Sequence, residues 1–209
     1  MSNGMQTGEK TLILIRHAPT AGNQSRRYVG MRTDESSSDS GRDLLAEQAD
    51  RLRKITNGAV WFTGPMKRCR ETAEVISHGG TPIVIEAFRE IDFGDFEGKT
   101  YEELSSDPAY QAWIDSGGEI PFPGGERKED YVNLQMQGLN TLLYDLGNRQ
   151  KAVLICHGGT IMAIMSTLTG GAYFDYHVSH LDGYILRFSK EDERISDLSY
   201  DRIGDRISG

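Results

Sequence analysis

Short apolar runs alternate along this chain with longer stretches in which apolar residues recur every three or four positions. Short runs of branched residues are typical of buried strands, whereas the longer period predicts amphipathic helices. Strands are expected at 11–15, 59–63, 82–86, 151–156 and 183–189, with a weaker one at 195–200. Because strands alternate with helices, the pattern predicts one α/β domain, a three-layer sandwich with a mostly parallel sheet and helices on both faces.

Capping residues and glycines delimit the expected helices. Ser40 followed by Asp43 resembles a capping box, which predicts a helix over 40–56, and Pro65 is expected at the first position of the next helix. Further helices are expected from the Thr100 capping box, over 132–146 and over 160–168. The helix over 132–146 is predicted to bury one apolar face, made of Val132, Met136, Leu139, Leu143 and Leu146.

Two polar stretches interrupt this alternation. Residues 1–10 form a tail that is predicted to be disordered, and a single domain is expected over 11–209. The segment 18–39 is predicted to be a loop. The irregular segment 90–127 is interpreted as an insertion that covers the carboxyl ends of the strands and contributes an acidic residue and a lid.

The charge balance limits the possible partners. The 209 residues carry 31 acidic and 23 basic side chains, a formal net charge of −8, which disfavours nucleic acid and anionic lipid. The opening residues lack a signal-peptide pattern, and no apolar run is long enough to span a bilayer. Two cysteines make no disulfide framework. We therefore expect a cytoplasmic protein with no membrane partner, whose anion site is a local basic pocket.

Basic side chains follow two of the predicted strands directly. One strand ends in Arg16-His17 and another in His157, which precedes two glycines. Ligands of open α/β sheets bind beyond the carboxyl ends of the strands, so the two histidines are expected to meet there. Arg68 lies in the first turn of a predicted helix, where free backbone N–H groups also favour an anion.

Five sequence motifs carry a family resemblance. They are LIRHAPTAGN, TGPMKRCRETAE, REIDFGDFEG, PGGER and LICHGGTI, and they follow one another between Leu12 and Ile161. In this order they resemble the signature of the histidine phosphatase (phosphoglycerate-mutase-like) superfamily. The opening R-H-A-x-T-x-x-N is similar to that of α-ribazole-phosphatase-like members of its phosphatase branch.

The resemblance implies a role for each matching residue. His17 would attack phosphorus and form a phosphohistidine, while Arg16, Arg68 and His157 would hold the phosphate oxygens. Glu90 would protonate the leaving alkoxide and then deprotonate water. Neutral substrate-binding donors are implied at Thr20, Asn23 and Gly158. Neither a metal nor another cofactor is implied.

Several residues depart from the family pattern or compete for these roles. Ala18 occupies a position where the family usually has glycine, and it should add a methyl close to the phosphate. Arg127 replaces the usual serine of the family pattern. Asp92 and Glu97 are the alternatives to Glu90 as the acid. Cys156 is interpreted as a core residue. His177 and His180 are interpreted as part of a surface loop or as a rim contact to substrate. Gly64 and Phe96 are further departures from the family pattern.

The sequence thus predicts a phosphomonoesterase that acts on a small phosphorylated metabolite. α-Ribazole phosphate and sugar phosphates are the substrates considered. A phosphoglycerate mutase and a catalytically weak module that binds a phosphorylated ligand are the alternatives. The sequence leaves the substrate and the oligomeric state open, a homodimer among the possibilities.

Overall fold

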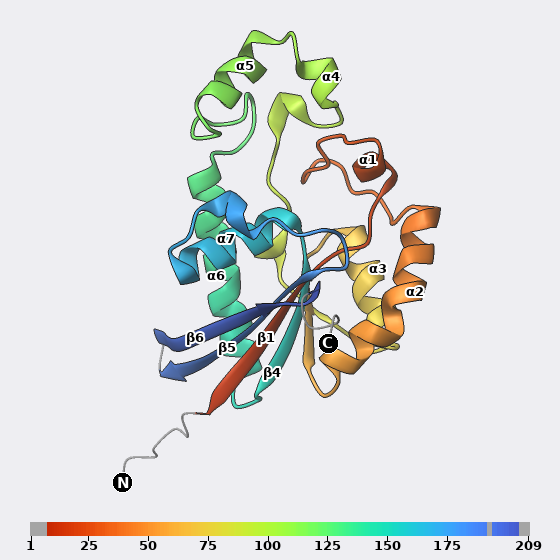
Figure 1. Ribbon diagram of the computed structural model, residues 1–209, viewed down its shortest axis with the longest axis vertical. Coiled ribbons are helices and arrows are strands. Elements are labelled where there is room, and N and C mark those ends of the chain that lie inside the picture. Colours follow the sequence, from red (N-terminus) through yellow and green to blue (C-terminus); the bar gives the residue numbers. More distant parts are fainter. Residues whose placement is uncertain (1–7, 192–193, 205–209) are drawn as a thin grey trace.

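A computed structural model of the chain describes residues 8–191 and 194–204, and its centre is one six-stranded sheet (Figure 1). The strand order is β3-β2-β4-β1-β5-β6. The strands span β1 Glu9–Arg16, β2 Val60–Thr63, β3 Ile83–Val84, β4 Lys151–Cys156, β5 Gly183–Glu191 and β6 Arg194–Arg202. All six predicted strands are therefore present.

Strands β1 to β4 run parallel to one another, whereas β5 pairs antiparallel with β1 and β6 pairs antiparallel with β5. The mostly parallel sheet is thus confirmed. In the central pair β1–β4, the last residues Arg16 and Cys156 are register partners. The residues that follow them, His17 and His157, consequently leave the sheet side by side.

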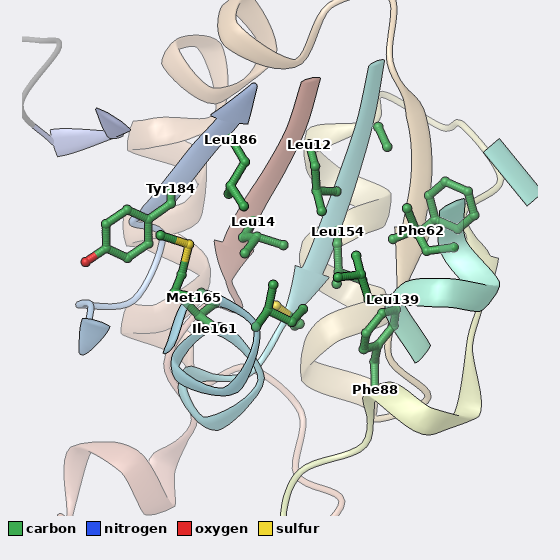
Figure 2. Close-up of a cluster of buried hydrophobic side chains, with 14 of the residues drawn as sticks. Leu12, Leu14, Phe62, Phe88, Leu139, Leu154, Ile161, Met165, Tyr184 and Leu186 are labelled. Atoms are coloured by element: carbon green, nitrogen blue, oxygen red, sulfur yellow. The ribbon is translucent and has the colours of Figure 1, made fainter. Parts of the chain in front are cut away.

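Helices cover both faces of the sheet, as the sandwich architecture requires (Figure 1). Helices α2 (Asp39–Thr56) and α3 (Lys67–Ile76) cover one face, and α6 (Lys128–Leu146) and α7 (Gly158–Thr169) cover the other. Successive strand residues point to opposite faces. Leu12, Leu14 and Leu154 therefore pack against α6 and α7 (Figure 2), while Ile13 and Ile15 pack against α2 and α3.

Two predicted helix starts are wrong by a few residues. Helix α2 is capped by Ser38, whose hydroxyl accepts from Gly41 N, and not by a box of Ser40 and Asp43. Ser38 N also donates to Pro19 O, which fixes the extended backbone that a cap needs. Helix α3 is capped by Met66, so Pro65 lies outside it.

The predicted buried face of α6 is right only in its second half. Leu139, Leu143 and Leu146 are buried, but Val132 and Met136 are partly exposed. Tyr131, Gln135, Gly138 and Leu142 take the buried positions instead. Helix α6 turns its first half toward the polar segment around Glu90, where Tyr131 and Gln135 find hydrogen-bond partners.

The predicted insertion 90–127 holds short helices that lie above the sheet (Figure 1), and it contains an aromatic cluster. The helices are η2 (Gly94–Phe96), α4 (Tyr101–Leu104) and α5 (Pro108–Asp115). Its own small core contains Phe96, Tyr110 and Phe122, and the partly buried Trp113 packs against it. The aromatic rings hold this lobe together without strands.

The remaining segments refine the predicted boundaries. The loop 18–39 contains a one-turn helix, α1 (Ala21–Gln24), and two further 3₁₀ turns occur at η1 (Glu86–Phe88) and η3 (Tyr173–Tyr176). Glu9 and Lys10 belong to β1 rather than to the predicted tail, because they pair with Ser189 and Phe188 of β5. Lys10 Nζ also donates to the carbonyls of Gly147 and Arg149. Residues 1–7 of that tail and residues 205–209 of the predicted domain lie outside the described residues. Over the described chain, no helix has the length and apolar character needed to cross a membrane.

Candidate active site

His17 lies directly beyond β1, with its backbone N–H donating to Cys156 O at 2.9 Å. Only 3% of the residue is exposed. Ring atom Nδ1 lies 2.7 Å from its neighbour's carbonyl, Ala18 O, and must donate its proton there because a carbonyl only accepts. The neutral ring then carries its lone pair on Nε2, the atom that would attack phosphorus.

The surroundings of His17 keep its imidazole neutral. Burial lowers the pKa of His17 well below its usual value, and the positive charges of Arg68 and Arg16 lower it further. A protonated imidazole has no lone pair to offer, so this environment preserves the nucleophilic form at neutral pH. The bond to Ala18 O acts in the opposite direction but does not reverse the sign.

Two arginines, Arg68 fully buried and Arg16 partly buried, provide the local positive charge that the sequence predicted. Arg16 Nη1 donates to Val178 O at 2.8 Å, and Arg68, which is fully buried, donates through Nη1 to Thr33 O at 2.8 Å. The Nε atoms of Arg16 and Arg68 are buried and have no acceptor among the described residues. Buried donors of this kind are costly unless an acceptor is bound, and an oxyanion supplies one.

His157 packs against His17 and caps helix α7. The two ring centroids are 5.1 Å apart, in an edge-to-face arrangement. Burial, then Arg68, lowers the pKa of His157 well below its usual value. Behind the ring lies Cys69, whose Sγ is 3.5 Å from His157 Nε2, and burial raises the pKa of this thiol. Cys69 therefore stays a thiol, and Cys156 is likewise buried and free, in agreement with its predicted core position.

The next residue, Gly158, lies against the guanidinium of Arg16. A Cβ built on Gly158 would lie 3.4 Å from Arg16 Nε. Gly158 is also the first residue of α7, and the amides of a first helical turn have no partners within the helix. The structure thus brings together the strand-end residues Arg16, His17, His157 and Gly158, with Arg68 close enough to perturb both imidazoles.

Glu90 joins this group from the start of the insertion. Its Oε1 accepts hydrogen bonds from Ile91 N and from the hydroxyl of Tyr131, both at 2.9 Å. Its Oε2 lies 3.8 Å from His157 Nδ1, which is too long for a hydrogen bond. Because both donors act on Oε1, Oε2 is the oxygen that can carry a proton. Burial raises the pKa of Glu90, which favours the protonated form that an acid catalyst needs.

The two alternative acids are engaged elsewhere. Asp92 forms a salt bridge with Arg32 at 2.8 Å and accepts from Gly94 N. Glu97 accepts hydrogen bonds from the amides of Gly30 and Arg32 and from a threonine hydroxyl. Both carboxylates organise loops, whereas Glu90 is the one that lies against His157.

Two supporting residues, Gly159 and Tyr131, were not among the predicted site residues. A Cβ on Gly159 would approach Glu90 Oε1 to 2.7 Å and the ring of Tyr131 to 3.1 Å. Only glycine leaves room for that carboxyl group. The second glycine of the H-G-G motif was a usable signal for Gly159. No sequence pattern pointed to Tyr131 as a site residue, because its partner Glu90 lies 41 positions away in the sequence.

Thr72 is a third supporting residue. The sequence could have indicated it, because Thr72 is the second threonine of the TGPMKRCRETAE motif. Its hydroxyl accepts from Ala18 N at 3.0 Å and donates to Arg68 O at 2.7 Å. Thr72 therefore joins the His17 loop to the helix that carries Arg68. Ala18 itself is buried in the apolar cluster between the sheet and α2 and α3, so its methyl packs into the core.

Thr20 and Asn23 form the cap of α1. Thr20 Oγ1 accepts from Asn23 N, and Asn23 Oδ1 accepts from Thr20 N, both at 3.2 Å. This reciprocal box fixes the shape of the loop after His17. Their predicted contacts with substrate stay predictions.

The two late histidines differ from each other. His180 was expected in a surface loop or at the rim, but it is partly buried beside His17, with ring centroids 5.2 Å apart. Its Nδ1 donates to His17 O at 2.9 Å, so it steadies the backbone of His17. Burial lowers the pKa of His180 to about 4. His177 is exposed and lines the cavity beside the site.

Comparisons with known proteins identify the family. The sequence profile of the histidine phosphatase superfamily (branch 1) matches residues 12–200, and the chain belongs to that family. It is 28% identical over 161 residues to phosphoglycerate mutase-like protein 4 of Arabidopsis thaliana, covering 73% of this chain and 68% of the relative. It is also 28% identical over 171 residues to glucosyl-3-phosphoglycerate phosphatase of Mycolicibacterium vanbaalenii, covering 77% and 75%.

A solved structure shows the same fold. The α-ribazole phosphatase of Shigella flexneri superposes with a TM-score of 0.72 over 89% of this chain and 93% of its own, at 19% identity. At that identity the likeness establishes the fold alone. The named relatives include phosphatases and a mutase-like protein, so phosphatase chemistry is supported within the superfamily.

Proposed function

We propose that the protein is a phosphomonoesterase that works through a phosphohistidine at His17. One observation carries the proposal: a buried, neutral imidazole has its Nδ1 proton held by Ala18 O and lies beside two arginines, Arg16 and Arg68, whose buried Nε atoms have no acceptor among the described residues. Nucleophilic attack on a phosphate dianion needs both a lone pair and positive charge around the oxygens. Arg16 and Arg68 provide the charge, and His157 and the Gly158 amide provide further donors.

The first step transfers the phosphoryl group to the protein. His17 Nε2 forms a bond to phosphorus while the bond from phosphorus to the ester oxygen breaks. Glu90 gives its proton to the departing alkoxide, so that an alcohol leaves. Arg16 and Arg68 hold the phosphoryl oxygens as their charge increases in the transition state.

The second step returns the protein to its starting state. Water attacks phosphorus, the bond from phosphorus to Nε2 breaks, and Glu90 takes a proton from the attacking water. The products are an alcohol and inorganic phosphate, and both His17 and Glu90 regain their original protonation. Because the charge is provided by arginines, no metal is needed in either step. We place the reaction in the cytoplasm.

A mutase is the second candidate, favoured by the similarity to the phosphoglycerate mutase-like protein. It would use the same first step but pass the phosphoryl group to a second hydroxyl instead of to water. A mutase converts 3-phosphoglycerate to its isomer without net release of phosphate, whereas a phosphatase releases one phosphate for each alcohol formed. Measuring both products in one reaction separates the two functions.

The decisive experiment traps the intermediate. Brief incubation with a labelled phosphate ester, followed by an acid-free quench, should leave phosphate on His17, identified by peptide mass spectrometry. His17→Asn should abolish trapping and essentially all turnover. His78→Asn is the matched control, because His78 is exposed and its φ of 57° suits asparagine. The same assay after EDTA treatment should give unchanged rates.

Two results would reject the proposal. The first is turnover by His17→Asn at more than a few per cent of the parent rate, which would mean that another group is the nucleophile. The second is a loss of activity with EDTA that magnesium restores, which would mean that a cation holds the phosphate.

A further inference from the structure

A cavity of about 480 Å³ opens beside the catalytic residues. Arg16, Glu90, Gly158 and Gly159 are among the residues that line it. Since Glu90 is the proposed proton donor to the leaving oxygen, the group attached to that oxygen must extend into this cavity. Its volume lies within the range of ordinary small-molecule sites. The cavity walls therefore indicate the chemical class of the alcohol that leaves.

Most of the cavity wall is aromatic or apolar. These side chains come from the loop 18–39, the insertion, α7 and η3. They are Tyr28, Ile91, Phe93, Trp113, Phe122, Met162, Tyr173 and Phe174.

The aromatic rings are held in place by contacts with one another. Trp113 stacks on Phe122 with centroids 4.8 Å apart, and Phe93 meets Phe122 edge-on at 5.1 Å. In η3, Tyr173 and Phe174 meet edge-on at 5.1 Å. Rigid walls of this kind bind a flat apolar group without losing much side-chain freedom.

The charged lining residues offer little to a carboxylate. Apart from Arg16, which is assigned to the phosphate, the basic side chains that line the cavity are Lys128 and His177. Lys128 is paired with Glu119, and its Nζ lies 6.0 Å from the centre of the Tyr173 ring. Burial, then Arg16, lowers the pKa of His177, which leaves this ring mostly neutral at neutral pH. A leaving group with its own negative charge would thus lose its hydration in the cavity without contacting an unpaired cation there.

We propose that the physiological substrate is a phosphate monoester of an alcohol that carries a flat, uncharged aromatic ring system. The ring lies against the aromatic walls of the cavity while the phosphate lies at Arg16, His17 and Arg68. This inference rests on the proposed phosphatase function and narrows its substrate class. It favours aromatic or nucleoside-like alcohols over glycerate, serine and simple sugars.

The kinetic test compares alkyl phosphates that differ in the group they release. 2-Naphthylmethyl phosphate, glycerol 3-phosphate and 3-phosphoglycerate all release a primary alkoxide, so the demand on Glu90 is similar. We expect kcat/KM to be about 10²-fold higher for the naphthylmethyl ester, because burial of its ring contributes to binding. An equal or higher value for either of the other two esters would overturn the inference.

A matched pair of variants locates the effect. Phe174→Ala removes a cavity ring that is 57% exposed, so the core is not disturbed. It should lower kcat/KM for the naphthylmethyl ester about 5- to 10-fold, through KM, and change glycerol 3-phosphate less than twofold. Tyr144→Ala removes an aromatic ring that is 83% exposed and does not line the cavity, and it should change neither. Equal losses for both esters in Phe174→Ala would contradict a ring-binding role.

A binding measurement separates this inference from the proposed function. 2-Naphthylmethyl phosphonate cannot be hydrolysed, and calorimetry can compare it with methyl phosphonate on the unmodified protein and on Phe174→Ala. Tighter binding of the naphthyl compound, weakened by Phe174→Ala, would support the ring site even if no ester were hydrolysed. Equal affinities for the two phosphonates would reject the ring site even if phosphatase activity were found.

Discussion

The hydroxyl of Tyr131 offers a sharp test of how Glu90 is tuned. Tyr131 donates to Glu90 Oε1 at 2.9 Å, and this bond favours the ionised carboxylate. Arg68 and Arg16 act in the same direction, while burial, the largest effect, favours the protonated acid. His157 and Tyr173, which also face the carboxyl group, are neutral because burial lowers the pKa of His157 and raises that of Tyr173. Tyr131→Phe removes one stabilising donor and leaves the others.

The sign and size of the effect follow from the hydrogen bond. A bond to a charged group contributes about 1.5–3 kcal/mol, and the lower figure corresponds to about a tenfold change in an equilibrium. Loss of the donor should raise the pKa of Glu90. At a pH where Glu90 is mostly ionised, the ratio of protonated to ionised Glu90 should then rise about tenfold. The first step needs the protonated form. The falling limb of the kcat/KM profile should therefore move to higher pH in Tyr131→Phe.

The assay is a pH profile of kcat/KM with an alkyl phosphate, which reports on the first step in the free enzyme. Tyr144→Phe is the control, because Tyr144 lies on the same helix and is 83% exposed. A lower plateau alone would show only that the carboxyl group is less well positioned. If the falling limb stays in place or moves to lower pH, the bond does not tune Glu90 and the reasoning is refuted.

Three further outcomes are expected. Glu90→Gln should slow single-turnover phosphoryl transfer from alkyl esters by about 10²–10⁴-fold but spare p-nitrophenyl phosphate, whose leaving group needs no proton; equal losses would exclude Glu90 as the acid. Gly159→Ala should displace the Glu90 carboxyl group and lower kcat/KM about 10²-fold for alkyl esters, with inhibition by inorganic phosphate unchanged; retention of full activity would show that the site can absorb the methyl. Leu154→Ala should cost about 2–5 kcal/mol of unfolding free energy in urea titrations, since Leu154 is fully buried; a loss under 1 kcal/mol would contradict its place in the main core.

Much of the fold follows from local pattern, and so does the placement of the central candidate residues of the site. The run Leu12–Ile15 is apolar on both faces because helices cover both sides of the sheet, which made β1 recognisable. His17 and His157 were predictable as neighbours, since each follows a strand and parallel strands end at the same edge. The motif order then added Arg68 and Glu90.

Other features depend on contacts that no local pattern contains. The cap at Ser38 was missed because its strength comes from Pro19 O, 19 residues earlier in the chain. Tyr131 was missed because the period of α6 indicates which residues are apolar, but not which hydroxyl meets a distant carboxyl group. The antiparallel direction of β5 was not visible either, because a strand's apolar pattern is the same in both directions.

The pairing of β1 with β4 also has a consequence for how the chain is made. β1 is the first strand to be synthesised, yet its central partner β4 ends 140 residues later, as the register of Arg16 with Cys156 shows. At about 5–20 residues per second, a ribosome needs about 7–30 s to cover that distance. During this time the run from Leu12 to Ile15 has neither of its neighbours, since β5 comes later still. This strand is therefore the one that stays unpaired longest during translation, and chaperones that bind exposed apolar segments have their longest opportunity at Leu12–Ile15.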